Sequence, residues 1–128
     1  MIEYLASLDP SVLVLDYDHN APTAEHLEAT HEKLFLAFRK AHPDTPVIML
    51  SRPRAASLMS ADDYRRREII RQTYLNAVAR GDGRVWFIDG STLMSEDGTV
   101  DGVHPTDLGF TLMANGIEPV LRRALSIL

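Results

Sequence analysis

Short apolar runs alternate with longer amphipathic stretches along this chain. Residues 11–18 (SVLVLDYD), 45–50 (TPVIML) and 84–89 (RVWFID) are largely apolar and rich in β-branched or aromatic side chains, and polar residues end or follow each run. Runs of this length and composition are typical of strands that are buried on both faces. The pattern therefore predicts three buried strands.

The stretches that follow these strands have apolar positions at helical spacing. Three helices are expected, from near Thr23 to before His42, from the N-cap Ser60 to Gly81, and from about Thr106 towards Leu125. The residues expected to face the core from the middle helix are Tyr64, Ile70, Tyr74 and Val78. With a short helix before the first strand, this order predicts one α/β domain. We expect a three-layer α/β/α sandwich around a parallel sheet of about three strands; the family resemblance described below implies that this sheet is incomplete.

Composition narrows the functional classes. The chain has 128 residues, a net charge of -5 and no cysteine. These features exclude disulfides and thiolate metal sites and disfavour a nucleic-acid or anionic-membrane partner. The sequence also contains no membrane span, and no signal peptide follows Met1. We therefore expect a soluble protein of unknown compartment that uses neither a cofactor nor a metal.

Polar residues follow all three predicted strands. They are DYDHN (16–20), SRPR (51–54) and the segment from DGST to DGVHP (89–105). Ligands of open α/β sheets bind beyond the carboxyl ends of the strands, so these segments predict a site at one edge of the sheet. Within the last segment, Asp101 lies three residues before His104. A carboxylate that fixes the tautomer of an imidazole makes it a useful general base, and we expect Asp101 to accept a hydrogen bond from Nδ1 of His104.

One interpretation of the first segment is a phosphatase. An apolar strand that ends in Asp-x-Asp resembles the nucleophile motif of haloacid-dehalogenase-like phosphatases, with Asp16 as nucleophile and Asp18 as acid/base beside magnesium. Both lysines, however, precede the second predicted strand, where that family's phosphate-binding lysine is not expected. The interpretation also leaves Asp101 and His104 without a role.

A second resemblance covers essentially the whole chain. DGVHPTDLGFTLMA (101–114) resembles the last conserved block of the SGNH, or GDSL-type, esterases and acylhydrolases, in which Asp-x-x-His-Pro leads into the C-terminal helix. LVLDYDHN (13–20) resembles the block whose asparagine completes the oxyanion hole. The segments HPDTPVIMLSRPR and FIDGSTLMSEDGTVDGVHP resemble the later strands of a carbohydrate-esterase-like branch of this family.

The resemblance implies a flavodoxin-like SGNH fold and assigns roles. His104 would be the general base, Asp101 its orienting partner and Asn20 an oxyanion donor. We also expect Arg52 and Arg54 to contact the substrate at the edge of the sheet, whereas the pattern gives His19 no role.

The chain departs from the family in two blocks. It contains neither the Gly-Asp-Ser block of the nucleophile nor the block that supplies an oxyanion glycine, and Asp18 replaces the glycine two positions before Asn20. Ser91 lies in Asp-Gly-Ser after the last strand, where we predict a turn. We therefore interpret residues 1–128 as the C-terminal part of an SGNH domain that is inactive alone. Its exposed strand 11–18 should recruit a complementing N-terminal segment or a second copy of the chain.

The function that we predict is serine ester hydrolysis of small acyl esters, including acetylated carbohydrate. The alternatives are the Asp16/Asp18 phosphatase and an inactive esterase remnant that acts as a binding module.

Overall fold

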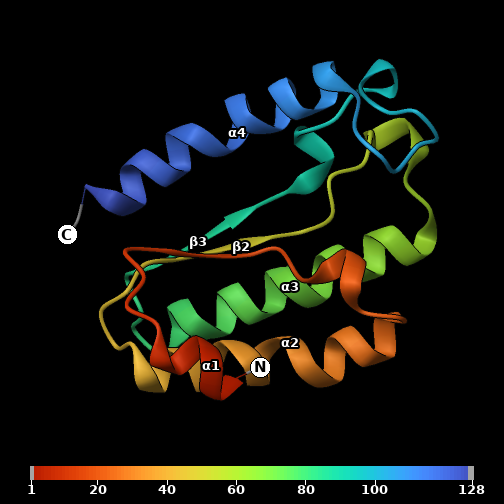
Figure 1. Cartoon of the computed structure of the whole chain (residues 1–128). Helices are drawn as coiled ribbons and strands as arrows, with labels where there is room; N and C mark the ends of the chain where they lie inside the picture. Colours follow the sequence, from red (N-terminus) through yellow and green to blue (C-terminus); the bar gives the residue numbers. More distant parts are fainter. Residues whose placement is uncertain (1, 127–128) are drawn as a thin grey trace.

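The computed structural model describes residues 2–126, and its elements alternate as expected (Figure 1). The helices and strands are α1 (Ile2–Ser7), β1 (Leu13–Leu15), α2 (Ala24–Ala41), β2 (Val47–Leu50), α3 (Ala61–Ala79), β3 (Val85–Ile88) and α4 (Asp107–Leu125). Short 3₁₀ helices lie in the connections: η1 (Asp18–Asn20), η2 (Ala56–Leu58), η3 (Gly90–Thr92) and η4 (Glu96–Gly98). None of the helices within this part of the chain is long and apolar enough to cross a membrane.

The three strands form one parallel sheet in the order β1-β2-β3. Every residue of β2 is buried, as its uniform apolar sequence predicts for a central strand. β1 pairs with β2 along one side, and within residues 2–126 no strand pairs with its other side. The outer side of β1 is therefore an open edge, as is the outer side of β3 within the same residues.

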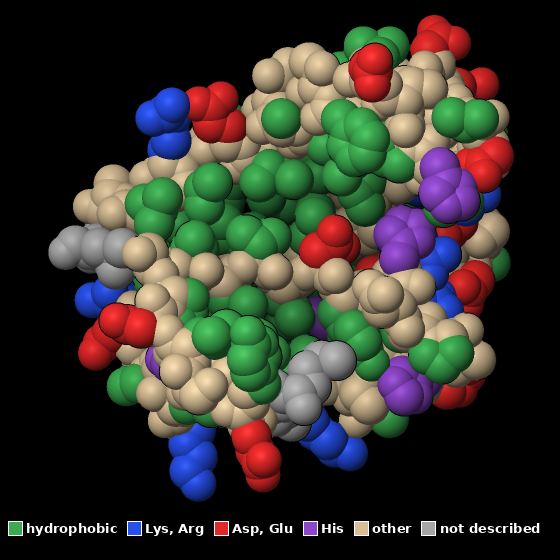
Figure 2. Space-filling model, viewed as in Figure 1, with side chains coloured by type: hydrophobic (Ala, Val, Ile, Leu, Met, Phe, Trp, Pro, Cys, Tyr) green, Lys and Arg blue, Asp and Glu red, His purple; other side chains and the backbone are tan. Residues whose placement is uncertain are grey.

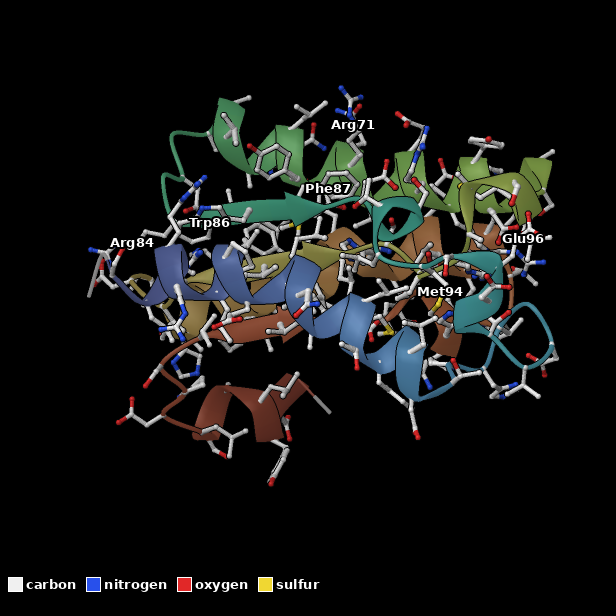
Figure 3. The ribbon with its side chains drawn as sticks, turned by 90° about the horizontal axis from the view of Figure 1, so that it is seen from above. Arg71, Arg84, Trp86, Phe87, Met94 and Glu96 are labelled. Atoms are coloured by element: carbon white, nitrogen blue, oxygen red, sulfur yellow. The ribbon has the colours of Figure 1, made fainter. Side chains whose placement is uncertain are left out.

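Helices cover both faces of the sheet, which confirms the three-layer α/β/α architecture. Figure 1 shows α1, α2 and α3 on one side of the strands and α4 on the other. Two apolar clusters hold the layers together, because neighbouring strand residues point to opposite faces. On β3, Phe87 packs with the cluster under α2 and α3, and Trp86 packs with the cluster under α4 (Figure 3).

The predicted helix starts are confirmed by their caps. The Thr23 side chain accepts a hydrogen bond from the His26 amide, and that of Thr106 accepts one from the Gly109 amide. Ser60 and Asp63 form a complete capping box at the start of α3.

Two details of the predicted pattern are wrong. The first strand spans only Leu13–Leu15, because Asp18 turns inward and begins η1. On α3, Ile70 is buried and Tyr74 packs against the core as predicted, but Tyr64 and Val78 are exposed and Arg66 is buried. The buried arginine belongs to a basic run that the pattern predicts to be solvated, so the inward face of the helix is shifted from the expected one.

Candidate active site

Backbone hydrogen bonds within the loop between η4 and α4 determine its conformation. A bridge joins Thr99 to Pro105, and the Val100 amide donates to the carbonyl oxygen of His104 at 2.9 Å. Gly102 reverses the chain with a φ of +85°, a conformation that glycine adopts without steric cost. The loop therefore presents residues 101–104 as one tight turn.

Within this turn, Asp101 and His104 form the predicted pair. Nδ1 of His104 lies 2.7 Å from Oδ2 of Asp101. The other carboxylate oxygen of Asp101 accepts the backbone amides of Val103 and His104, at 3.0 and 2.8 Å. Both oxygens of the carboxylate are thus fixed, and they fix the orientation of the imidazole in turn.

This geometry fixes the charge of Asp101 and the tautomer of His104. Hydrogen bonds from the backbone and the ring of His104 hold the pKa of the Asp101 carboxyl well below its usual value, so Asp101 is a carboxylate at neutral pH. A carboxylate can only accept, so Nδ1 of His104 carries the proton and the lone pair of the neutral ring is on Nε2. Nε2 has no hydrogen-bond partner among residues 2–126, and 77% of the side chain is exposed. His104 is therefore free to accept a proton.

A close contact between Gly98 of η4 and Gly109 of α4 attaches this turn to the start of α4. Gly109 is buried, and a Cβ atom there would overlap the carbonyl oxygen of Gly98. The Thr106 amide also donates to the Gly98 carbonyl oxygen at 2.9 Å. The close contact lets η4 and α4 hold the two ends of the Asp101–His104 turn.

A second polar centre lies after β1, around Asp18. Its side chain is completely buried and accepts the backbone amide of Arg52 at 2.9 Å. The guanidinium groups of Arg52 and Arg66 lie 3.3 and 3.2 Å from Oδ1 of the same carboxylate. Arg66 also donates to the carbonyl oxygens of Asp18 and Ala21, at 3.1 and 3.2 Å. These bonds fix both ends of the η1 turn.

The predicted oxyanion donor, Asn20, is the last residue of η1. Its backbone amide donates to the carbonyl oxygen of Tyr17 at 3.0 Å, whereas its exposed side chain has no hydrogen-bond partner among the described residues. An unpaired amide on a fixed turn is suited to donate to a ligand. The role of Asn20 stays a prediction.

Arg52 and Arg54 lie at the predicted edge, but both are paired within the protein. Arg52 contacts Asp63 at 3.1 Å in addition to Asp18. Arg54 lies 3.5 Å from Asp63 and donates to the Leu58 carbonyl oxygen at 2.9 Å. Burial would raise the pKa of Asp63, but the Ser60 hydrogen bonds and the two arginines lower it below its usual value. Contact of the two arginines with a substrate stays a prediction.

A cleft of about 430 Å³ brings the loops after β1 and β2 together with the Asp101–His104 turn. It is lined by Asp16, His19, Pro53, Val103, His104, Pro105 and Met113. Figure 2 shows an apolar hollow between α4 and the strands, with acidic and histidine side chains at one end. Asn20 follows His19 directly but does not line the cleft.

Asp16 and His19 are the cleft residues whose place the sequence reasoning missed. Burial raises the pKa of Asp16 above its usual value, and burial followed by the charge of Arg52 lowers that of His19. The signal was available in the spacing, because DYDHN places both residues within one turn of the end of β1. The sequence pattern interprets Asp16 only as a phosphatase nucleophile and gives His19 no role.

The environment of Asp18 disfavours the phosphatase. A carboxyl that is enclosed by Arg52 and Arg66 cannot serve as an exchangeable acid beside Asp16. The described residues contain no group of three or more His, Asp or Glu side chains arranged to hold a metal ion. Ser91 lies in the predicted turn, where its hydroxyl donates to Asp89 at 2.7 Å.

Comparison with known proteins adds independent information. The model of a family described as the GDSL-like lipase/acylhydrolase family matches residues 1–122. No curated protein matches the chain. Among solved structures, the chain is similar to a protein described as a GDSL-like lipase from Bacteroides ovatus, with 27% identity and a TM-score of 0.83 over 98% of this chain and 39% of that one.

Two further structures share the fold at lower identity. A salicylyl-acyltransferase of a tetracycline biosynthetic pathway has 17% identity and a TM-score of 0.76 over 99% of this chain and 41% of its own. An active-site mutant of a family two carbohydrate esterase from Clostridium thermocellum has 18% identity and a TM-score of 0.74 over 97% and 38%. The chain thus spans about two fifths of the length of these proteins.

Proposed function

Because the chain belongs to the GDSL-like lipase/acylhydrolase family, we propose that it provides the general base, the orienting acid and an oxyanion donor of a serine ester hydrolase. The substrates are small acyl esters, including acetylated carbohydrate. One observation carries the proposal: His104 is held through Nδ1 by Asp101 at 2.7 Å and exposes Nε2 beside a cleft at the carboxyl edge of the sheet.

The chemistry follows from the two nitrogen atoms of His104. Nε2 removes the proton of a serine hydroxyl as its oxygen attacks the ester carbonyl, and it then returns that proton to the departing alcohol. Asp101 stabilises the imidazolium that forms between these steps. The side-chain amide of Asn20 donates to the carbonyl oxygen as it gains negative charge, which is the task of an oxyanion hole.

We propose that the nucleophile lies on a segment outside residues 1–128 that pairs with β1. The sequence contains no Gly-Asp-Ser, and the free edge of β1 offers unpaired backbone groups to an added strand. Val14 on this strand is 38% exposed, although its neighbours Leu13 and Leu15 are covered. Such a segment would bring its serine to the carboxyl edge of the sheet, next to the η1 turn.

The test is release of nitrophenol from an aryl acetate by two proteins. The chain alone should show essentially no turnover. The same chain fused to a family strand-and-turn segment that carries Gly-Asp-Ser should be active. In the fusion, His104→Ala should lower kcat by about 10²–10⁴-fold and Asn20→Ala by about 10²–10³-fold.

His26→Ala is the matched control, since this exposed histidine lies on α2 and should leave activity unchanged. Activity of the fusion that does not depend on His104 would contradict the proposal. Turnover by the chain alone would place the nucleophile within residues 1–128, with Ser91 the first to replace. Light scattering of the unfused chain distinguishes the two possible partners of β1, an N-terminal segment and a second copy of the chain. A second copy gives a dimer, and this dimer should disappear in the fusion, where the added segment pairs with β1.

A further inference from the structure

The basic run Arg65–Arg67 on α3 contains one arginine whose side chain is buried. The side chain of Arg66 is 5% exposed, against 48% for Arg65 and 25% for Arg67. Burying a guanidinium group costs free energy unless protein acceptors replace the water that it loses. The acceptors that Arg66 reaches therefore indicate what this buried charge does.

Nη1 of Arg66 reaches both sides of the η1 turn. It donates to the carbonyl oxygens of Asp18 and Ala21, at 3.1 and 3.2 Å, and lies 3.2 Å from Oδ1 of Asp18. Figure 1 shows this turn next to the first half of α3. Asn20 lies between the two residues whose carbonyl oxygens are bound. Within residues 2–126 no hydrogen bond joins Arg66 to Asn20 itself, so Arg66 acts on Asn20 through the backbone.

A second contact fixes the orientation of the guanidinium group. Nε of Arg66 donates to Oδ2 of Asp62 at 2.7 Å, one turn earlier on α3. The guanidinium group is planar and rigid, so a fixed Nε also restricts the position of Nη1. Arg66 thus links the short η1 turn to a helix of 19 residues.

The η1 turn has few restraints of its own. Two backbone hydrogen bonds close it, at 3.0 and 3.2 Å. Hydrogen bonds of a 3₁₀ turn have poorer geometry than those of an α-helix. In the part of the chain that the structure describes, hydrogen bonds from Arg52 reach only the carboxylate of Asp18, whereas Arg66 also binds backbone carbonyl oxygens. Arg66 is therefore the side chain that restrains the backbone on both sides of Asn20.

We infer that Arg66 is a positioning residue of the ester hydrolysis, which aims the side-chain amide of Asn20 through the backbone of η1. This inference deepens the proposed function and rests on it. An oxyanion donor is effective only at about 2.7–3.1 Å from the position of the charged oxygen. A displacement of about 1 Å costs on the order of 10²-fold in rate. Because this donor stabilises charge that develops in the transition state, loss of Arg66 lowers kcat and leaves KM unchanged.

The first test measures ¹⁵N relaxation of the purified chain. The backbone order parameters of Asn20 and Ala21 should be about 0.85 in the unchanged chain and about 0.6 or lower in Arg66→Met. Met keeps an unbranched side chain but has no donor, and Arg66→Lys, which keeps a cationic donor, should restore most of the order. Arg65→Met is the matched control, because the exposed Arg65 pairs with glutamates of α2 and should not affect η1. These order parameters report motion within the folded chain, so a change in stability alone does not alter them.

The second test measures kinetics of the fusion with the Gly-Asp-Ser segment. Arg66→Met should lower kcat about tenfold and change KM by less than about twofold. In a fusion that already carries Asn20→Ala, the same substitution should change kcat by less than about twofold, because the donor through which Arg66 acts is absent. Arg65→Met should leave kcat and KM unchanged in both fusions.

Unchanged order at η1 in Arg66→Met would overturn the inference, and so would an equal loss of order along α2. An equal loss of kcat with and without Asn20 would also overturn it, since Arg66 would then act by another route. An inactive fusion contradicts the proposed esterase, whereas the relaxation measurement still decides whether Arg66 positions the turn that carries Asn20.

Discussion

The turn after β1 and the turn before α4 each centre on an aspartate, but the two carboxylates are held in opposite ways. Asp18 is completely buried and is reached by Arg52 and Arg66 from other parts of the chain. The Asp101 side chain is 52% exposed, and its partners are its own turn and His104. The two aspartates therefore differ both in their burial and in where their partners come from. Asp18 supports the fold at the edge of the sheet, and Asp101 orients a group that remains accessible.

Replacing each aspartate by asparagine tests this difference most directly. Asp18→Asn leaves two buried guanidinium groups without a full counter-charge, which should lower the free energy of unfolding by about 3–5 kcal/mol. Asp101→Asn should hardly change it, because exposed ion pairs contribute little to stability. Urea denaturation followed by circular dichroism measures both. Similar losses of unfolding free energy for the two variants would show that the buried Asp18 contributes no more to stability than the exposed Asp101.

The two histidines near these carboxylates provide the second comparison. His31 is completely buried on α2, where Nδ1 lies 3.0 Å from the Thr73 hydroxyl and Nε2 has no partner among the described residues. Burial lowers the pKa of His31 to about 4, against 6.5 for a free histidine, while the nearby charges of Asp18 and Glu32 act in the opposite direction. His104, by contrast, is exposed.

The unfolded chain therefore binds a proton at His31 at higher pH than the folded one. Stability from this group is complete above pH 6.5 and is lost as the pH falls from 6.5 towards 4, by about 3 kcal/mol in all. His31→Leu should remove this part of the pH dependence of unfolding, and Thr73 would retain its bond to the Ile69 carbonyl oxygen. His26→Leu, on the exposed side of the same helix, should leave the profile unchanged. Parallel profiles for wild type and His31→Leu would contradict the assignment.

A smaller effect is expected where the Asp101–His104 turn meets α4. In Gly109→Ala the new methyl group overlaps the carbonyl oxygen of Gly98, so backbone must move, at a cost of about 1–3 kcal/mol. The displaced turn should also shift the NMR signals of His104. Gly83→Ala is the control, because a Cβ atom there meets nothing within 4 Å. A Gly109→Ala variant as stable as Gly83→Ala would mean that the contact does not position the turn.

The parts of the molecule that could be predicted are those determined locally. The apolar pattern of each strand is contained in a few consecutive residues, and the helix caps and the Asp101–His104 bond join residues a few positions apart. The bonds around Asp18 join residues that are 34 and 48 positions apart, and no local pattern signals them. The same network explains both errors in the fold. It draws Asp18 out of the predicted strand and turns Arg66 towards the core at the expense of Tyr64.

The cleft residues were missed for a related reason. Asp16 and Asp18 look equivalent in the sequence, and only the position of the arginines separates an unpaired carboxyl from a buried one. The place of His19 in the cleft depends on the opposing turn, which lies more than eighty residues later in the chain.

The shortness of the Asp101–His104 turn also has a genetic consequence. Asp101 and His104 are encoded within four consecutive codons, so recombination or deletion elsewhere in a gene leaves them together. The Asp18 network, by contrast, survives only if three separate segments are inherited with one another. Segments elsewhere in such a chain can therefore change while this hydrogen-bonded pair is inherited intact.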